Sequence, residues 1–98
     1  MSYAYVANNG ANTVTKINLS TFAIVGTALA VGAGPYSIAI DSTNTYAYVT
    51  NNTANTVTKI NLSTFATVGS ALTVGASPQS IAIEHAIATI NSAFLAFM

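Results

Sequence analysis

The feature that most constrains this chain is an internal repeat. The segment YAYVANNGANTVTKINLSTFA, which begins at Tyr3, returns as YAYVTNNTANTVTKINLSTFA from Tyr46. Residues 3–41 align with residues 46–84 at an offset of 43 without a gap, and 31 of these 39 positions are identical. The repeat predicts one structural unit that the chain forms twice.

The repeated unit is typical of β-structure. Short runs rich in Val, Ile, Thr and Tyr alternate with Asn, Gly, Pro and Ser, and no 3.6-residue periodicity runs through them. The expected strands span residues 3–8, 13–19, 23–31 and 37–40 in the first copy, and 46–51, 56–62, 66–74 and 80–83 in the second. Gly69 marks a bulge or point of twist. The sequence therefore predicts an all-β fold of antiparallel meanders.

The period and one short motif indicate a particular architecture. Four strands in 43 residues is the size of a β-propeller blade. Tyr48–Asn51 reads YVTN, and Tyr5–Asn8 reads YVAN; an Asn-Thr-Val segment, a Val-Gly pair and a Pro-x-Ser-Ile-Ala-Ile run follow in both copies. On these residues, 3–84 resemble the YVTN family of β-propeller repeats. The resemblance implies blades like those of surface-layer proteins and, more distantly, of lactonase-like and haem-d1-type propellers.

The resemblance also implies where each strand lies within a blade. In that family the Pro-x-Ser-Ile-Ala-Ile run is the innermost strand. With strands named a to d from inside to outside, the chain reads b-c-d, a-b-c-d, a. Residues 1–84 then comprise two tandem repeats, 3–45 and 46–84, and residues 85–98 form an apolar C-terminal tail. The first blade is expected to lack strand a, while residues 80–83 supply a strand a without a blade.

Two blades do not close a ring, so we expect oligomerisation to complete it. Residues 80–83 should pair with residues 3–8 of another subunit, or of their own chain, with Ile81 as a ladder donor. Two blades per chain allow six, eight or ten blades, and we favour a trimer or tetramer over a pentamer. The residues expected at the subunit interface are Tyr3, Tyr5, Ser80, Ile81, Ile83, Phe94 and Phe97.

The tail EHAIATINSAFLAFM leaves the repeat. Ile87, Ile90, Phe94 and Phe97 recur at the spacing of one face of a short helix. A strand and a truncated third repeat are alternatives. We expect a segment this apolar to pack in a buried site, between subunits or against the channel.

Composition excludes several classes of function. Only four of 98 residues are charged, and the net charge is zero. Nucleic acid and electrostatic membrane binding both require clustered Lys and Arg. Cysteine is absent, so disulfides and thiolate metal sites are excluded. No apolar stretch is long enough to span a bilayer, and no signal peptide is recognisable. A surface this poor in charge does little to oppose self-association.

The sequence offers little for catalysis. His85 is the only histidine, and only Glu84 neighbours it as an acid. No nucleophile–base pair or metal-ligand spacing is present, so we expect no enzyme, cofactor, metal or catalytic residue. Asp41 and Glu84 are repeat equivalents and are interpreted as turn residues, with a cation site at the ring's mouth as the alternative. Lys16 and Lys59, where the family usually carries an apolar residue, are expected to extend along a blade edge.

One set of polar residues is a candidate ligand site. The amides of the b–c loops and two residues of the d–a loops are expected on one face: Asn8, Asn9, Asn12, Tyr36, Asn51, Asn52, Asn55 and Gln79. Amides beside an aromatic ring suit sugar hydroxyls, whereas Asn is also favoured in tight turns. Three differences between the copies fall on this face: Gly10/Thr53, Gly34/Ser77 and Tyr36/Gln79.

The leading interpretation is a non-enzymatic structural or interaction module that assembles into a homo-oligomeric propeller. The alternatives are a carbohydrate-binding, lectin-like ring, a lactonase-like enzyme, and a filament built by pairing of exposed strand edges. The family resemblance favours an extracellular or cell-surface location.

Overall fold

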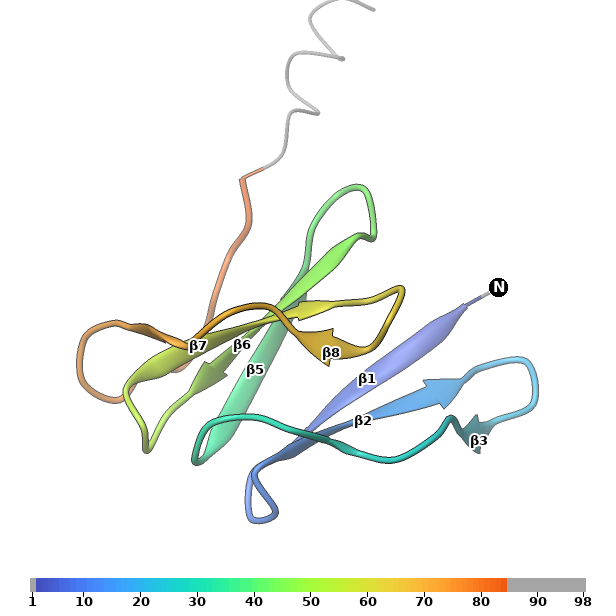
Figure 1. Ribbon diagram of the computed structural model, residues 1–98, viewed down its shortest axis with the longest axis horizontal. Helices are drawn as coiled ribbons and strands as arrows, with labels where there is room; N and C mark the ends of the chain where they lie inside the picture. Colours follow the sequence, from blue (N-terminus) through green and yellow to red (C-terminus); the bar gives the residue numbers. More distant parts are fainter. Residues whose placement is uncertain (1, 85–98) are drawn as a thin grey trace, which may run out of the picture.

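In the computed structural model, which describes residues 2–84, every element is a β-strand (Figure 1). The strands are β1 Tyr3–Asn8, β2 Thr13–Asn18, β3 Ala23–Ile24, β4 Leu29–Ala30, β5 Pro35–Ile40, β6 Tyr46–Asn51, β7 Thr56–Asn61, β8 Ala66–Thr67 and β9 Leu72–Thr73. Residues 2–84 contain no helix that is long and apolar enough to cross a membrane. The predictions for His85 and for the tail, including Phe94 and Phe97, lie outside the described residues.

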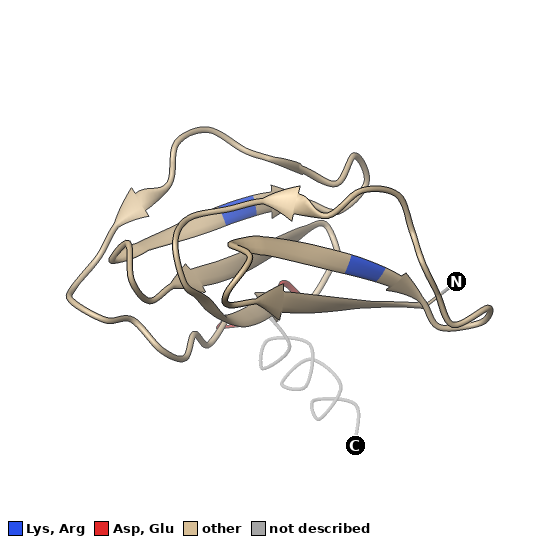
Figure 2. Cartoon of the chain, turned by 90° about the horizontal axis from the view of Figure 1, so that it is seen from below, with Lys and Arg blue, Asp and Glu red and all other residues tan. Residues whose placement is uncertain are grey.

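The strands form two antiparallel sheets, one from each copy of the repeat. In the first sheet the order is β1-β2-β3, and β4 also pairs with β2; in the second it is β5-β6-β7-β8, and β9 also pairs with β7. Within residues 2–84 the first sheet has no counterpart of β5, as the order b-c-d, a-b-c-d predicted. Figure 2 shows the two sheets stacked, with a lysine on the central strand of each, Lys16 in β2 and Lys59 in β7.

The prediction of one continuous third strand in each copy was wrong. Residues 23–31 contribute two short strands, which pair with opposite ends of β2 through Ile17↔Ile24 and Val14↔Leu29. Gly26 lies between them at φ +68°, and Gly69 takes φ +67° in the second copy. This left-handed conformation, which glycine adopts without a steric penalty, turns the chain out of the ladder. The prediction of a bulge or twist point at Gly69 is thereby confirmed.

The second and fourth predicted strands also need correction. β2 and β7 end one residue early, because Oδ1 of Asn18 and of Asn61 accepts two N–H groups of the following turn. Residues 80–83 form no strand within the described chain. Their counterpart β5 is a strand because β6 lies beside it, whereas no described strand lies beside residues 80–83.

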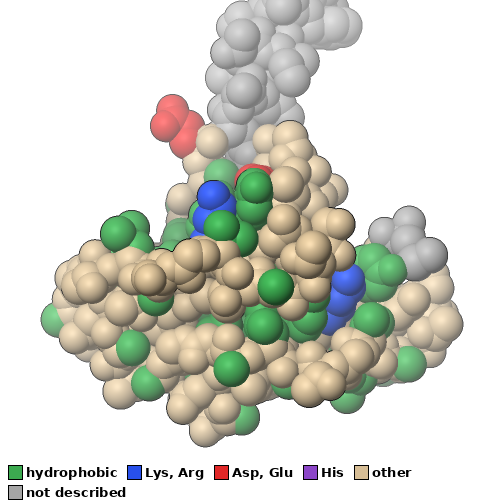
Figure 3. Space-filling view, viewed as in Figure 1, with side chains coloured by type: hydrophobic (Ala, Val, Ile, Leu, Met, Phe, Trp, Pro, Cys, Tyr) green, Lys and Arg blue, Asp and Glu red, His purple; other side chains and the backbone are tan. Residues whose placement is uncertain are grey.

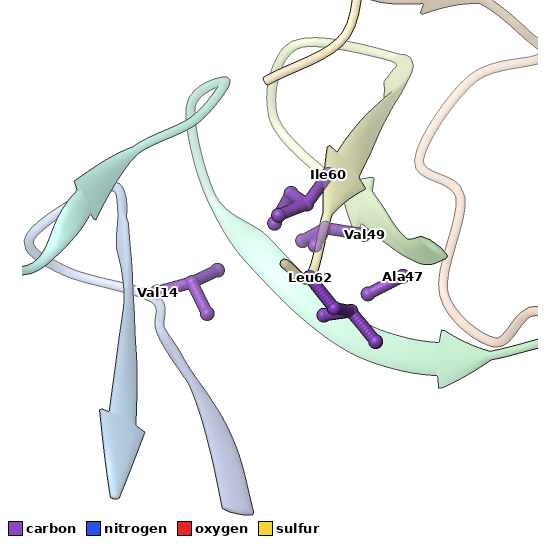
Figure 4. Close-up of a cluster of buried hydrophobic side chains, with 5 residues drawn as sticks. All are labelled: Val14, Ala47, Val49, Ile60 and Leu62. Atoms are coloured by element: carbon purple, nitrogen blue, oxygen red, sulfur yellow. The ribbon is translucent and has the colours of Figure 1, made fainter. Parts of the chain in front are cut away.

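The core lies between the two sheets. Val14, Ala47, Val49, Ile60 and Leu62 are its buried hydrophobic side chains. In Figure 4, Val14 extends from the first sheet toward the other four, which belong to the second sheet. Val14 and Val49 are not repeat equivalents. The two blades therefore meet through different faces of the repeated sheet. The first blade uses the face that carries Val14, and the second blade uses the other face, which carries Val49.

Candidate assembly interface

The first blade leaves exposed the face that the second blade buries. Val49 is 0% exposed, whereas its equivalent Val6 is 41% exposed. Leu62 is 8% exposed and its equivalent Leu19 is 48% exposed. Identical side chains thus differ in exposure because the second-blade positions have neighbours that the first-blade positions lack: the facing blade and, for Val49, the paired strand β5. We call the face that carries Val6 and Leu19 the open face of the first blade.

Phe22 extends this open face. Its equivalent Phe65 is half-buried, and the Phe65 ring centroid lies 6.0 Å from that of Tyr5 in the first blade. Phe22 itself is 79% exposed. An aromatic ring contributes a large apolar area when it is buried. The open face of the first blade therefore carries, in Phe22, the same aromatic side chain that contacts the neighbouring blade within the chain.

The second blade is open on its other side. Leu29 and Val31 of the first blade are partly buried and pack against the core, whereas their equivalents Leu72 and Val74 are exposed. We call the face with Leu72 and Val74 the open face of the second blade. The two open faces correspond to the two sides of the internal contact, so together they are complementary.

A sheet edge is open as well. In the second sheet β5 covers the edge of β6, with Ile38 opposite Val49, Ala39 opposite Tyr48 and Ile40 opposite Ala47. In the first sheet, no strand formed by residues 2–84 pairs with β1 on the side away from β2. An uncovered strand edge exposes hydrogen-bonding groups and favours pairing with another strand.

The hydrogen bonds between β5 and β6 indicate which N–H groups of residues 80–83 would donate if these residues paired with β1 of another copy. The N–H of Asp41 donates to the carbonyl of Tyr46 at 3.0 Å. Because alternate residues of an antiparallel strand face the same neighbour, the N–H of Ala39 also faces β6. If residues 80–83 paired in the register of β5, shifted by the repeat offset, the ladder donor would be Ala82 in place of the predicted Ile81. Ile81 would lie opposite Val6 in a non-hydrogen-bonded pair.

The segments that follow the two blades are held by equivalent hydrogen bonds. Asn9 donates to the carbonyl of Pro35 at 3.2 Å, and Asn52 donates to the carbonyl of Pro78 at 3.0 Å. The Oδ1 atoms of Asn12 and Asn55 accept the N–H groups of the residues that precede those prolines, at 3.0 and 2.9 Å. Residues 78–83 are therefore directed from the second blade as β5 is directed from the first.

These contacts also account for the candidate ligand residues. Asn8 donates to the hydroxyls of Thr13 and Thr15, and Asn51 makes the same pair of bonds to Thr56 and Thr58. Asn12 and Asn55 take φ of 60°, the turn conformation for which Asn is suited. Each of the six Asn side chains is thus bonded within the chain. Tyr36 is 57% exposed and Gln79 is exposed, and each follows a bonded proline carbonyl.

The interpretation of Asp41 as a turn residue is confirmed. Its carboxylate accepts the N–H groups of Thr45 and Tyr46 and the hydroxyl of Thr43. Desolvation alone would raise the pKa of Asp41, but these hydrogen bonds and the charge of Lys59 outweigh it and lower the pKa below 3.8. Residues 2–84 contain no cluster of three acidic, His or Cys side chains that would hold a metal.

A lowered pKa makes the contribution of Asp41 to stability depend on pH. The contribution is present above the ordinary value of 3.8 and is lost as pH falls through the lower folded-state pKa. We expect Asp41→Asn to lower the melting temperature at neutral pH, and the difference from the parent to shrink as the pH approaches about 2. Thermal melts across this range test it, and a difference that grows at low pH would contradict it.

Both lysines stack on tyrosines. The Nζ of Lys16 lies 4.2 Å from the ring centroid of Tyr3, and that of Lys59 lies 4.2 Å from the ring of Tyr46. In these cation–π contacts the charged end of each lysine lies over an aromatic ring, at a position where YVTN repeats usually carry an apolar side chain. Burial, with the nearby Tyr3 as a smaller cause, raises the pKa of Tyr5.

A pocket of about 530 Å³ lies between the blades. Tyr3, Tyr5 and Lys16 line it from the first blade, and Ile40 and Leu62 line it from the second. The side chain of Tyr5, which was expected at the subunit interface, thus belongs to the contact between the two blades of one chain. Among the described residues 2–84, those that line the pocket include no carboxylate and no histidine.

No family model matches the chain. No curated protein matches it either. Among solved structures it is similar to hydrazine synthase of Kuenenia stuttgartiensis, with a TM-score of 0.76 and 22% sequence identity over 81% of this chain. The chain spans 22% of the length of that protein. At this identity the similarity shows the fold alone: the two sheets are stacked antiparallel blades of the propeller type.

Proposed function

We propose that the chain is a non-enzymatic structural module whose copies assemble head to tail into a closed β-propeller. The observation that carries this proposal is the pair Val6 and Val49, of which one is 41% and the other 0% exposed although the repeat makes them equivalent. The second blade of one copy, placed on the first blade of the next, would bury Val6 as Val49 is buried.

Burial of this face supplies the driving force. A fully buried Val, Leu or Phe side chain contributes about 1.5–3 kcal/mol, and Val6, Leu19 and Phe22 all lie on the open face of the first blade. Charge does not oppose the contact, since the chain has four charged residues and no net charge. Figure 3 shows few charged side chains on the face of the molecule that it displays.

The proposal also gives residues 80–83 a partner. They leave the second blade in the direction that β5 takes from the first, held by Asn52 and Asn55. Next to β1 of another copy they would complete its blade with Ser80 opposite Ala7, Ile81 opposite Val6 and Ile83 opposite Ala4. This pairing repeats the register of β5 and β6 at the offset of 43.

Identical head-to-tail contacts either close into a ring or continue as a filament. A ring made only of copies of this chain holds an even number of blades, and we favour six or eight, from a trimer or tetramer. The YVTN motif supports membership of that family and a role at the cell surface. The amides required for sugar binding are already bonded within the chain, so the lectin-like alternative has less support.

Solution mass tests the proposal, with Val6→Lys as the decisive variant. We expect multi-angle light scattering to give three or four times the chain mass of 10.0 kDa, and Val6→Lys to reduce it to that of single chains. A lysine there would bury an unpaired charge in the contact. Ala28→Lys is the matched control, because Ala28 and its equivalent Ala71 are both exposed. A parent protein of 10 kDa would refute the proposal.

A further inference from the structure

A close contact between two loops shows how one blade recognises the next. The N–H of Asn52 donates to the carbonyl of Gly34 at 2.7 Å, and the N–H groups of Thr53 and Ala54 donate to the carbonyl of Ala33. The loop that leaves the first blade is thereby bonded to the β6–β7 loop of the second. Backbone groups make all three bonds, so the two loops approach closely.

This approach leaves no space for a side chain at position 34. A Cβ added to Gly34 would overlap Oγ1 of Thr53 and lie 3.0 Å from the Cβ and the backbone nitrogen of Thr53. Gly34 also has φ +68°, which L side chains rarely adopt. The side chain of Thr53 therefore requires glycine at position 34.

The repeat equivalents of Gly34 and Thr53 have their side-chain sizes exchanged: the glycine is replaced by a residue with a side chain, and the threonine is replaced by glycine. Position 77, the equivalent of Gly34, is Ser77, which keeps the left-handed conformation at φ 53° despite its side chain. Position 10, the equivalent of Thr53, is Gly10, and a Cβ added there would meet nothing within 4 Å in the chain. The residue facing Ser77 in a repeated contact is thus the one without a side chain.

We propose that the side-chain sizes of these two pairs determine which blades can contact each other. In the allowed contact between chains, the loop that leaves the second blade and contains Ser77 docks on the β1–β2 loop of a second copy. This inference rests on the proposed assembly and names the specific site of recognition. When Ser77 faces Gly10 of the second copy, there is no threonine side chain for the Cβ of Ser77 to overlap. The remaining 3.0 Å approach to the backbone nitrogen is relieved by a shift of a few tenths of an ångström.

The sorting excludes the wrong partner. Ser77 opposite Thr53 of a second copy would place two side chains where the internal contact has room for one. The second blade of one chain therefore does not dock on the second blade of another. Gly10 is the only first-copy counterpart of Thr53, so the acceptable partner is the first blade of the next chain.

The test uses two substitutions, Gly10→Thr and Ser77→Gly, which together give the contact between chains the same residues as the contact within the chain. Gly10→Thr should fold as the parent does, since Gly10 has open space around it and no left-handed φ. It should weaken association by about 10- to 100-fold, because overpacking at a contact costs of this order. Adding Ser77→Gly should restore association, since the pair then matches Thr53 and Gly34. Ser77→Gly alone should leave the ring intact.

Light scattering over a dilution series, with circular dichroism to verify folding, separates the outcomes. A parent protein that is monomeric would refute the proposed assembly itself. A parent ring that Gly10→Thr leaves equally stable would overturn the sorting by these loops and leave the assembly standing. Failure of Ser77→Gly to rescue a folded but dissociated Gly10→Thr variant would also overturn it.

Discussion

Ala82→Pro is expected to abolish the ring. In the proposed assembly the N–H of Ala82 would be the ladder donor toward β1 of the next copy, since its equivalent Ala39 faces β6. Proline removes that donor, and each contact in a closed ring carries the same loss. We expect light scattering to show single chains of about 10 kDa, or aggregates formed through the open β1 edge, in place of a discrete oligomer.

Ala82→Ser is the matched control for this change, because it keeps the backbone donor and adds one atom to an exposed side chain. It should assemble like the parent. If Ala82→Pro forms an oligomer of unchanged mass and stability, residues 80–83 do not pair with β1, and the ring must be held in another way.

Replacing Ile60 with alanine should cost about 2–5 kcal/mol of the free energy of unfolding, because Ile60 is 1% exposed in the core. Ile17 is its equivalent on the open face of the first blade and is only half-buried in the single chain. Assembly would bury Ile17 in the same environment. We therefore expect Ile17→Ala to destabilise the assembled protein by a similar amount.

Urea unfolding of both variants at one chain concentration gives this comparison. Similar losses for Ile17→Ala and Ile60→Ala support burial of the open face. A loss for Ile17→Ala of less than half that for Ile60→Ala would mean that the face stays exposed in solution.

Much of the fold was predictable from the sequence because the repeat doubles every signal. The ranges of β1 and β6 follow directly from YAYVAN and YAYVTN, bounded by turn-forming Asn residues. The third run of each copy was not predictable in the same way. Its β-forming composition indicated one strand, but the left-handed glycines Gly26 and Gly69 divide it. A glycine's φ is set by the tertiary context, which composition does not record.

The candidate site was predictable only in outline. Open blade faces follow from the strand order, but the exposure of Val6 against Val49 needs the packed structure. The Asn residues illustrate the same limit. Their types fit both sugar binding and turn formation, and only the bonds from Asn9 and Asn52 to proline carbonyls show how they are used. The exchange of Gly10 and Thr53 was visible in the sequence, whereas its contact with position 34 was not.

A covalent cross-link tests the central claim, head-to-tail closure, most directly. Val6 and Ile81 would form a non-hydrogen-bonded antiparallel pair, in which the Cα atoms lie about 4.5 Å apart, within the range of a disulfide. The chain has no cysteine of its own, so after Val6→Cys with Ile81→Cys no native thiol competes for the bridge between positions 6 and 81. After oxidation, a non-reducing denaturing gel should show a covalent species of three or four chains that reduction returns to 10.0 kDa. A product that remains a single chain after oxidation would contradict the account.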